Sequence, residues 1–81
     1  VTRQAAAPEL FDHLRALRTE IALRDRIPPY VVFSDATLKD MCAVLPKTRE
    51  EMLTVKGVGE HKTKKYGESF LRCIEEHRSK D

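Results

Sequence analysis

The chain has 81 residues but no tryptophan, only three glycines and few aromatic side chains. It also lacks any apolar run near the roughly 20 residues that a membrane-spanning helix needs, so we exclude a membrane-spanning protein. There is no initiator methionine or signal peptide, and the opening VTRQAAAP is typical of a tail or a linker remnant. We therefore expect one small domain, with one modest core, cut from a longer protein.

Residues for catalysis or metal binding are scarce. His13, His61 and His77 do not have the spacing of metal ligands, no serine has a nucleophile-elbow setting, and no Walker-type loop is present. Cys42 and Cys73 stand outside any C-x-x-C pair, and we interpret them as reduced, buried thiols of a cytosolic protein, although a disulfide between them stays open. The sequence predicts a domain that is not an enzyme and holds no cofactor and no metal.

Apolar spacing predicts an all-α fold. A stripe from about Pro8 to Leu23 is typical of an amphipathic helix, and further helices are expected over about 35–45, 48–53, 59–66 and along the last stretch before the C-terminus. Ser34 or Asp35 can cap the second helix, and Thr48 with Glu51 has capping-box spacing for the third. The core-facing residues are Leu10, Leu14, Leu17, Ile21, Leu38, Met41, Cys42, Leu45, Phe70, Leu71 and Ile74. We expect a compact bundle of five short helices.

The segment PPYVVF interrupts the helical pattern after the first helix. Two prolines cannot lie inside a helix, and no second strand-like run could pair with this one. We expect a short 3₁₀ turn that directs Val31, Val32 and Phe33 inward. Tyr30 on this rigid turn is a candidate for stacking on an unpaired base. The alternative is a partly buried tyrosine with only its hydroxyl at the surface.

Positive charge and glycine both concentrate in TVKGVGEHKTKKYG, residues 54–67. This stretch holds all three glycines and four of the seven lysines, while the rest of the chain is slightly acidic. Gly57 and Gly59 predict a helix-hairpin-helix-like turn, with Val58 inward and free N–H groups at the start of the next helix. The lysines Lys56, Lys62, Lys64 and Lys65 then suit a phosphate backbone. A plain turn with solubilising lysines is the alternative.

Two segments in this order, PPYVVFSDATLKDM and LPKTREEMLTVKGVGEHKTKKYGESFL, resemble the HRDC domain, the helicase-and-RNase-D C-terminal module. The resemblance covers roughly Leu10 to His77 and is strongest to the copy at the end of bacterial RecQ DNA helicases. RNase D copies usually carry a Pro-Arg-Arg-Trp-like segment where this chain has Pro28-Pro29-Tyr30-Val31. The chain departs from the RNase D pattern there, which favours the RecQ assignment.

The resemblance implies a five-helix bundle with an accessory role, in a parent protein that is an ATP-dependent DNA helicase. It implies weak, sequence-tolerant binding of single-stranded or partial-duplex DNA, and it assigns the aromatic at the Pro-Pro-Tyr position, Tyr30, to DNA contact. Arg26 and Lys39 are weaker candidates beside this turn. A module that docks on the helicase core or a repair partner is one alternative, and a domain guiding RNA to an RNase D-type exonuclease is another.

We divide the chain into a tail or linker remnant (1–8), the HRDC domain (9–78) and a C-terminal tail (79–81). The same resemblance implies a monomer in the bacterial cytoplasm, associated with the nucleoid, with the helicase core of its own chain as a partner.

Overall fold

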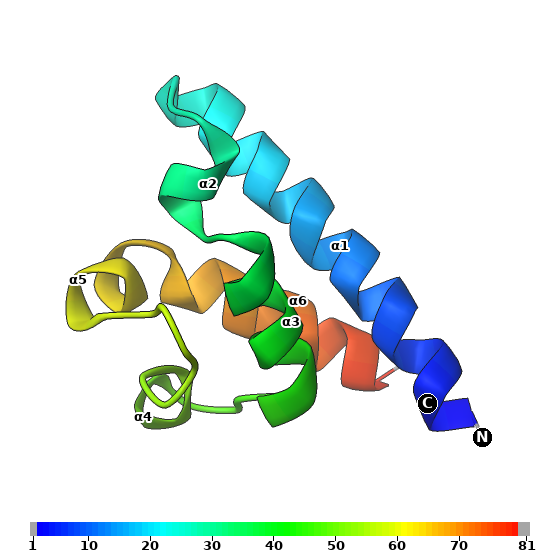
Figure 1. The fold of residues 1–81 in the computed structure, drawn as a ribbon. Coiled ribbons are helices and arrows are strands. Elements are labelled where there is room, and N and C mark those ends of the chain that lie inside the picture. Colours follow the sequence, from blue (N-terminus) through cyan, green and yellow to red (C-terminus); the bar gives the residue numbers. More distant parts are fainter. Residues whose placement is uncertain (1, 80–81) are drawn as a thin grey trace.

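The computed structural model describes residues 2–79, with side chains from 9 to 78, and this range contains helices and no strand. The helices are α1 (Thr2–Asp25), α2 (Pro29–Val32), α3 (Asp35–Val44), α4 (Arg49–Met52), α5 (Glu60–Lys62), the π-helical turn η1 (Thr63–Gly67) and α6 (Glu68–Ser79). Because α5, η1 and α6 follow one another without a break, the chain forms five helical segments. The predicted all-α bundle is confirmed (Figure 1).

The first helix is longer than its apolar stripe. It extends back to Thr2, so Pro8 lies inside it and not in its first turn as the sequence suggested. At its other end, the Ile27 amide donates to the Ala22 carbonyl (3.0 Å) and the Arg26 amide to the Leu23 carbonyl (3.3 Å). This is a Schellman ending, in which the left-handed position is filled by Arg26 (φ 59°) and not by glycine. The chain is thus turned sharply just before Pro28.

The expected short turn after α1 is present as a single α-helical turn, α2, with prolines at its entry. Val32 and Phe33 are fully buried, as predicted, but Val31 is 39% exposed, so the inward prediction for Val31 is wrong. Successive side chains of a helical turn point in directions about 100° apart, so Val31, Val32 and Phe33 cannot all face the core. Tyr30 and Val31 therefore face outward while Val32 closes the turn.

Phe33 is the centre of the core. Its ring meets the Phe70 ring edge to face (centroids 5.0 Å apart, 89°) and the Tyr66 ring similarly (6.0 Å, 73°). Such pairs add to the free energy gained by burying the rings. The fully enclosed apolar residues around it are Leu10, Leu14, Val32, Leu38, Met41, Met52, Phe70 and Ile74. Leu17, Cys42, Leu45 and Leu71, which were also expected in the core, are only half-buried against it.

Arg18 joins α1 to the start of α3 from a nearly buried position, 8% exposed. Its Nη1 donates to the Phe33 carbonyl (3.0 Å) and to Asp35 Oδ1 (2.7 Å). The hydrogen bond from Arg18 holds the pKa of Asp35 below the ordinary value of 3.8, against a smaller opposing effect of desolvation. One guanidinium thus fixes the end of the segment that presents Tyr30.

Side chains cap α3 and α4 as the sequence predicted. Ser34 Oγ accepts from the Thr37 amide (3.2 Å), which selects Ser34 over Asp35 as the cap, and Thr48 Oγ1 accepts from the Glu51 amide (3.1 Å). The reciprocal half of the capping box is shifted by one residue, because Glu51 Oε1 accepts from the Lys47 amide (2.7 Å). Both helices therefore begin at positions set by local hydrogen bonds.

The hairpin between α4 and α5 needs one of its two glycines. Gly57 has φ 85°, and an added Cβ would collide with the Thr37 hydroxyl on α3. Gly59 has φ −110°, and a Cβ there would meet no atom within 4 Å. Val58 is buried, as expected. The hairpin is thus held close against α3, and only Gly57 permits that approach.

One continuous helix follows from Glu60 to Ser79, with a wider π turn at Thr63–Gly67. The predicted end of a helix at about residue 66 is wrong, because the next residue, Gly67, is buried inside the continuous helix, where an added Cβ would press on the Thr63 methyl group (3.2 Å). The wider turn buries both Tyr66 and Gly67, two consecutive residues, on the core side. A π turn re-aims the side chains around it relative to a regular α-helix.

Candidate nucleic-acid interface

Tyr30 stands out from the surface. Its side chain comes from α2 and is 71% exposed, whereas Val32 and Phe33, which follow shortly after it in the sequence, are fully buried. The Arg18 contacts to Phe33 and Asp35 hold the far end of this turn, and Pro28 and Pro29 restrict its near end. An exposed ring on a rigid support is the geometry that base stacking requires.

Two arginines lie at the end of α1, next to the turn that carries Tyr30. Arg26 is exposed at the left-handed position. Arg24, which sequence reasoning missed, is also exposed, and its Nε donates to Asp25 Oδ1 (3.1 Å). This hydrogen bond and the Asp25 charge raise the pKa of Arg24, with a smaller contribution from Tyr66 on η1.

Lys62 and Lys65 line the same region from α5 and η1. The Lys62 ammonium lies 5.7 Å from the centroid of the Phe33 ring, and the Lys65 ammonium lies 5.5 Å from that of Tyr66. Phe33 directly follows α2, so Lys62 is brought next to the segment that presents Tyr30. We call Tyr30, Lys62 and Lys65, with Arg24 and Arg26, the α2–η1 face. The figure likewise shows α2 and α5 at neighbouring positions on one side of the molecule (Figure 1).

Lys56 and Lys39 lie elsewhere, along α3. The Lys56 amide donates to Asp40 Oδ2 (2.9 Å), which attaches the start of the hairpin to α3. Lys39 acts electrostatically on Asp35, whose pKa it helps to lower. Both lysines are exposed, but each has an aspartate of α3 close to it.

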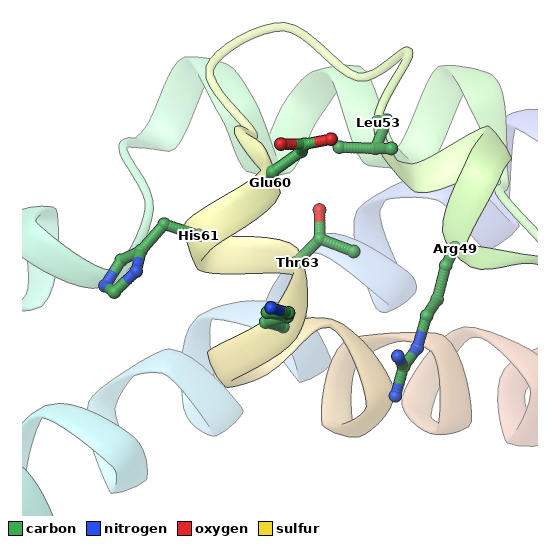
Figure 2. A pocket seen from close by; sticks show the side chains of 6 residues that line it. Arg49, Leu53, Glu60, His61 and Thr63 are labelled. Carbon is green, nitrogen blue, oxygen red and sulfur yellow. The ribbon is translucent and has the colours of Figure 1, made fainter.

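Lys64 points to a third place, a pocket of about 450 Å³ between α4 and the helix that starts at Glu60. Its lining consists of Arg49, Leu53, Glu60, His61, Thr63 and Lys64 (Figure 2). Sequence reasoning missed Arg49 and Thr63 here. Their only signal in the sequence is that they flank the glycine hairpin, and the packing of α4 on η1 is needed to bring them together.

Other chemistry finds little support in the described residues. Within 2–79 no group of three or more histidine, cysteine or acidic side chains could hold a metal ion. No helix in that range combines the length and the apolarity needed to cross a membrane. Cys42 and Cys73 are half-buried thiols whose pKa values are raised by burial, and neither is in a disulfide.

These features define a class of protein: a small helical domain that offers an exposed aromatic turn and separate cationic surfaces. Residues 7–74 match the HRDC domain family, and the chain belongs to this family. HRDC is an accessory, non-catalytic domain of RecQ helicases, as the sequence comparison also indicates.

Three relatives illustrate the match. The ATP-dependent DNA helicase RecQ of Bacillus subtilis is 52% identical over 67 residues, and that of Haemophilus influenzae is 45% identical over 71 residues. These segments cover 83% and 88% of this chain but only 11% and 12% of the two helicases. The solved structure of D. radiodurans RecQ HRDC domain 3 is 37% identical with a TM-score of 0.81, covering 84% of this chain and 90% of that one. The recognised resemblance to RecQ copies is thereby confirmed.

Proposed function

We propose that this domain binds single-stranded or partial-duplex DNA as an accessory part of a RecQ-type, ATP-dependent DNA helicase. The α2–η1 face carries the proposal, because it combines the 71% exposed Tyr30 ring with the cations Lys62 and Lys65. The relatives are named as DNA helicases, which supports DNA as the polymer. In this proposal the domain acts as a monomer at the bacterial nucleoid, beside the helicase core of its own chain.

Each residue of the face has a separate task. The Tyr30 ring stacks on an unpaired base, and Lys62, Lys65 and Arg26 neutralise nearby phosphates. Since the face holds its ligand by stacking on a base and by charge on the phosphates, binding is sequence-tolerant. The N–H groups at the start of α5 contribute little, because Glu60 lies in that first turn and repels phosphate. Lys39 and Lys56 make weaker contacts beyond the face.

Replacing Tyr30 with alanine is expected to raise the dissociation constant for a labelled single strand by about 5- to 150-fold, since stacking contributes about 1–3 kcal/mol per base. The stability of the fold should not change, because the side chain is largely exposed. Fluorescence anisotropy at fixed salt measures this. Tyr30→Phe keeps the ring and should bind as the wild type does. Equal affinity of the alanine and phenylalanine variants would remove Tyr30 from the interface.

The salt dependence of binding tests the lysines of the same face. The logarithm of the binding constant falls linearly with the logarithm of the salt concentration, with a slope of about 0.7 for each phosphate contact on a single strand. A Lys62→Gln, Lys65→Gln double variant loses two such contacts, so its slope should be about 1.4 smaller. Lys47→Gln is the matched control, because Lys47 is exposed among the carboxylates of Glu68, Glu75 and Glu76. If Lys47→Gln changed the slope by half as much as the double variant does, the effect would reflect net charge and not a defined contact.

Docking to protein is the second candidate, favoured by apolar exposure in the same region. Leu23 is 75% exposed and Val31 is 39% exposed, both close in sequence to Tyr30. In a domain that docks on the helicase core, backbone amide NMR signals of this region would shift on adding the remaining domains of the helicase and would not move with an oligonucleotide. A domain that guides RNA would instead prefer RNA over DNA strands of one sequence.

A further inference from the structure

The pocket between α4 and the helix from Glu60 to Ser79 is not part of the α2–η1 face. It encloses about 450 Å³, a size within the range of small-ligand sites in proteins, about 300–1,000 Å³. Its side chains come from two elements, with Arg49 and Leu53 on the α4 side and Glu60, Thr63 and Lys64 on the other. A ligand that fits this pocket has to match the groups that both elements supply.

Thr63 is the most informative of them. The residue is 5% exposed, and its Oγ1 is buried without a hydrogen-bond partner among the described residues. Figure 2 shows the hydroxyl turned toward Glu60 and Leu53, into the pocket, while His61 points away from them. Buried hydroxyl groups normally have a partner. The hydroxyl is covered in the unliganded domain, where Oγ1 exposes less than 1 Å², so a bound molecule that supplies the missing hydrogen bond has to displace the side chains over it.

The charges of the side chains that line the pocket limit which class of ligand can bind there. Arg49 and Lys64 are cationic, Glu60 is anionic, and Leu53, 40% exposed, offers an apolar surface. A simple anion would use the two cations but would leave most of the volume empty and would face Glu60. An apolar molecule would desolvate three charges without pairing them. A nucleotide has a phosphate, an apolar ring face and a base edge with both donors and acceptors.

We propose that this pocket holds one nucleotide of a bound single strand, an inference that rests on the proposed DNA-binding function. Arg49 and Lys64 take the phosphate, and the base lies against Leu53. Glu60 accepts a hydrogen bond from the base edge, and the Thr63 hydroxyl donates one to it. Every unpaired DNA base offers at least one donor and one acceptor on its Watson–Crick edge, so the pocket recognises a nucleotide without selecting its sequence.

A second surface pocket supplies a comparison within the same molecule. It encloses about 350 Å³ and is lined by Lys47, Glu68, Leu71, Arg72, Glu75 and Glu76. It also has two cations and one leucine, but it has three carboxylates, and Arg72 approaches Glu68 at 4.0 Å. The excess of carboxylates disfavours a phosphate there. Arg72 is therefore a matched control for Arg49 and Lys64.

The test is an amide NMR titration of the whole domain with deoxycytidine monophosphate, with deoxycytidine and with inorganic phosphate. The monophosphate should shift the signals of Arg49 and of residues 60–64, and the other two probes should need at least about fivefold higher concentrations, because each uses only part of the pocket. Thr63→Val should leave the melting temperature unchanged or higher, since it removes an unpaired buried hydroxyl. It should weaken binding of the monophosphate by about fivefold, as should Lys64→Gln, while Arg72→Gln should not.

The same variants, measured on a labelled single strand, separate this inference from the proposed function. A strand affinity that depends on Tyr30 but not on Thr63 or Lys64, with no monophosphate shifts at the pocket, overturns the pocket and leaves the function standing. If the monophosphate shifts the NMR signals of the pocket but the domain binds no single strand, the proposal that the nucleotide belongs to a strand is overturned, and a free nucleotide is the ligand. Weaker strand binding by both Thr63→Val and Lys64→Gln, with Arg72→Gln unchanged, supports the inference.

Discussion

Replacing Gly57 with alanine is expected to lower the free energy of unfolding by about 2–5 kcal/mol. A side chain at a left-handed backbone position costs about 1–2 kcal/mol, and forcing an extra carbon into a filled site typically costs about 1–3 kcal/mol more. Both apply, because Gly57 has φ 85° and its Cβ would collide with the Thr37 hydroxyl. For a domain of this size such a loss is a large share of the total stability. Urea unfolding followed by circular dichroism measures it.

The chain offers its own control two residues away. Gly59→Ala should change stability by less than about 0.5 kcal/mol, since φ is −110° there and the space is open. Adding Thr37→Ala to Gly57→Ala should restore the part of the unfolding free energy that the collision removes. It should not restore the part that the left-handed backbone conformation removes. Equal losses for Gly57→Ala and Gly59→Ala would show that the hairpin does not approach α3 as closely as described.

Replacing Arg18 with methionine is expected to lower the free energy of unfolding by about 1–3 kcal/mol, because the Phe33 carbonyl would stay buried without its donor. Methionine retains much of the volume of the side chain, so the loss reports the polar contacts. Arg15→Met is the control, since Arg15 is exposed, lies 5.8 Å from the centroid of the Phe11 ring and lowers the pKa of Asp35 by its charge alone, without a hydrogen bond. Urea unfolding at neutral pH should show little change for this control.

The pH dependence gives a second measure of the Arg18 contact. The pKa of Asp35 is below 3.8 in the folded wild type because Arg18 donates to its carboxylate. The contribution of this pair to stability is therefore present above pH 3.8 and is lost as the pH falls through the lower, folded value. In Arg18→Met this loss is absent, so the difference between the two proteins should narrow on acidification. If the difference in unfolding free energy between the two proteins stayed constant with pH, the Asp35 carboxylate would not contribute to the stabilisation by Arg18.

Local features of the fold could be predicted from the sequence because they depend on a few neighbouring residues. Thr48 caps α4 through the amide three residues later, and Ser34 does the same for α3. The stripe from Leu10 to Ile21 is buried as its spacing indicated, apart from the half-buried Leu17. In each case the information lies within one or two helical turns.

Other features depend on contacts between distant segments, which spacing does not reveal. Gly57 and Gly59 look equivalent in GVG, and only the approach of α3 makes one of them necessary. Gly67 looks like a helix end, but packing of Thr63 and Tyr66 in a π turn keeps it inside the helix. Lysines that are adjacent in sequence, such as Lys64 and Lys65, point to different surfaces because successive helical positions differ by about 100°.

The candidate site shows the same division. Exposure of Tyr30 followed from the proline turn and from the resemblance to RecQ copies, and it is present in the structure. That Lys62 lies beside this turn, while Lys56 lies beside Asp40 on α3, could not be predicted without the fold. Arg49 and Thr63 were missed because two helices bring them together, and Arg24 was missed although its partner, Asp25, is the next residue.

The pairing of α1 with α6 has a consequence for how the domain can be attached. The His13 and His77 ring centroids are 6.2 Å apart, so the last turns of α6 lie against the first half of α1, and Figure 1 shows the start of α1 and the end of α6 at one pole of the molecule. The short helix α2, which carries Tyr30, lies far from this pole, within a body whose longest dimension is 37 Å. A fluorescent label, a surface linker or a neighbouring domain joined at either terminus would therefore leave the turn that carries Tyr30 accessible.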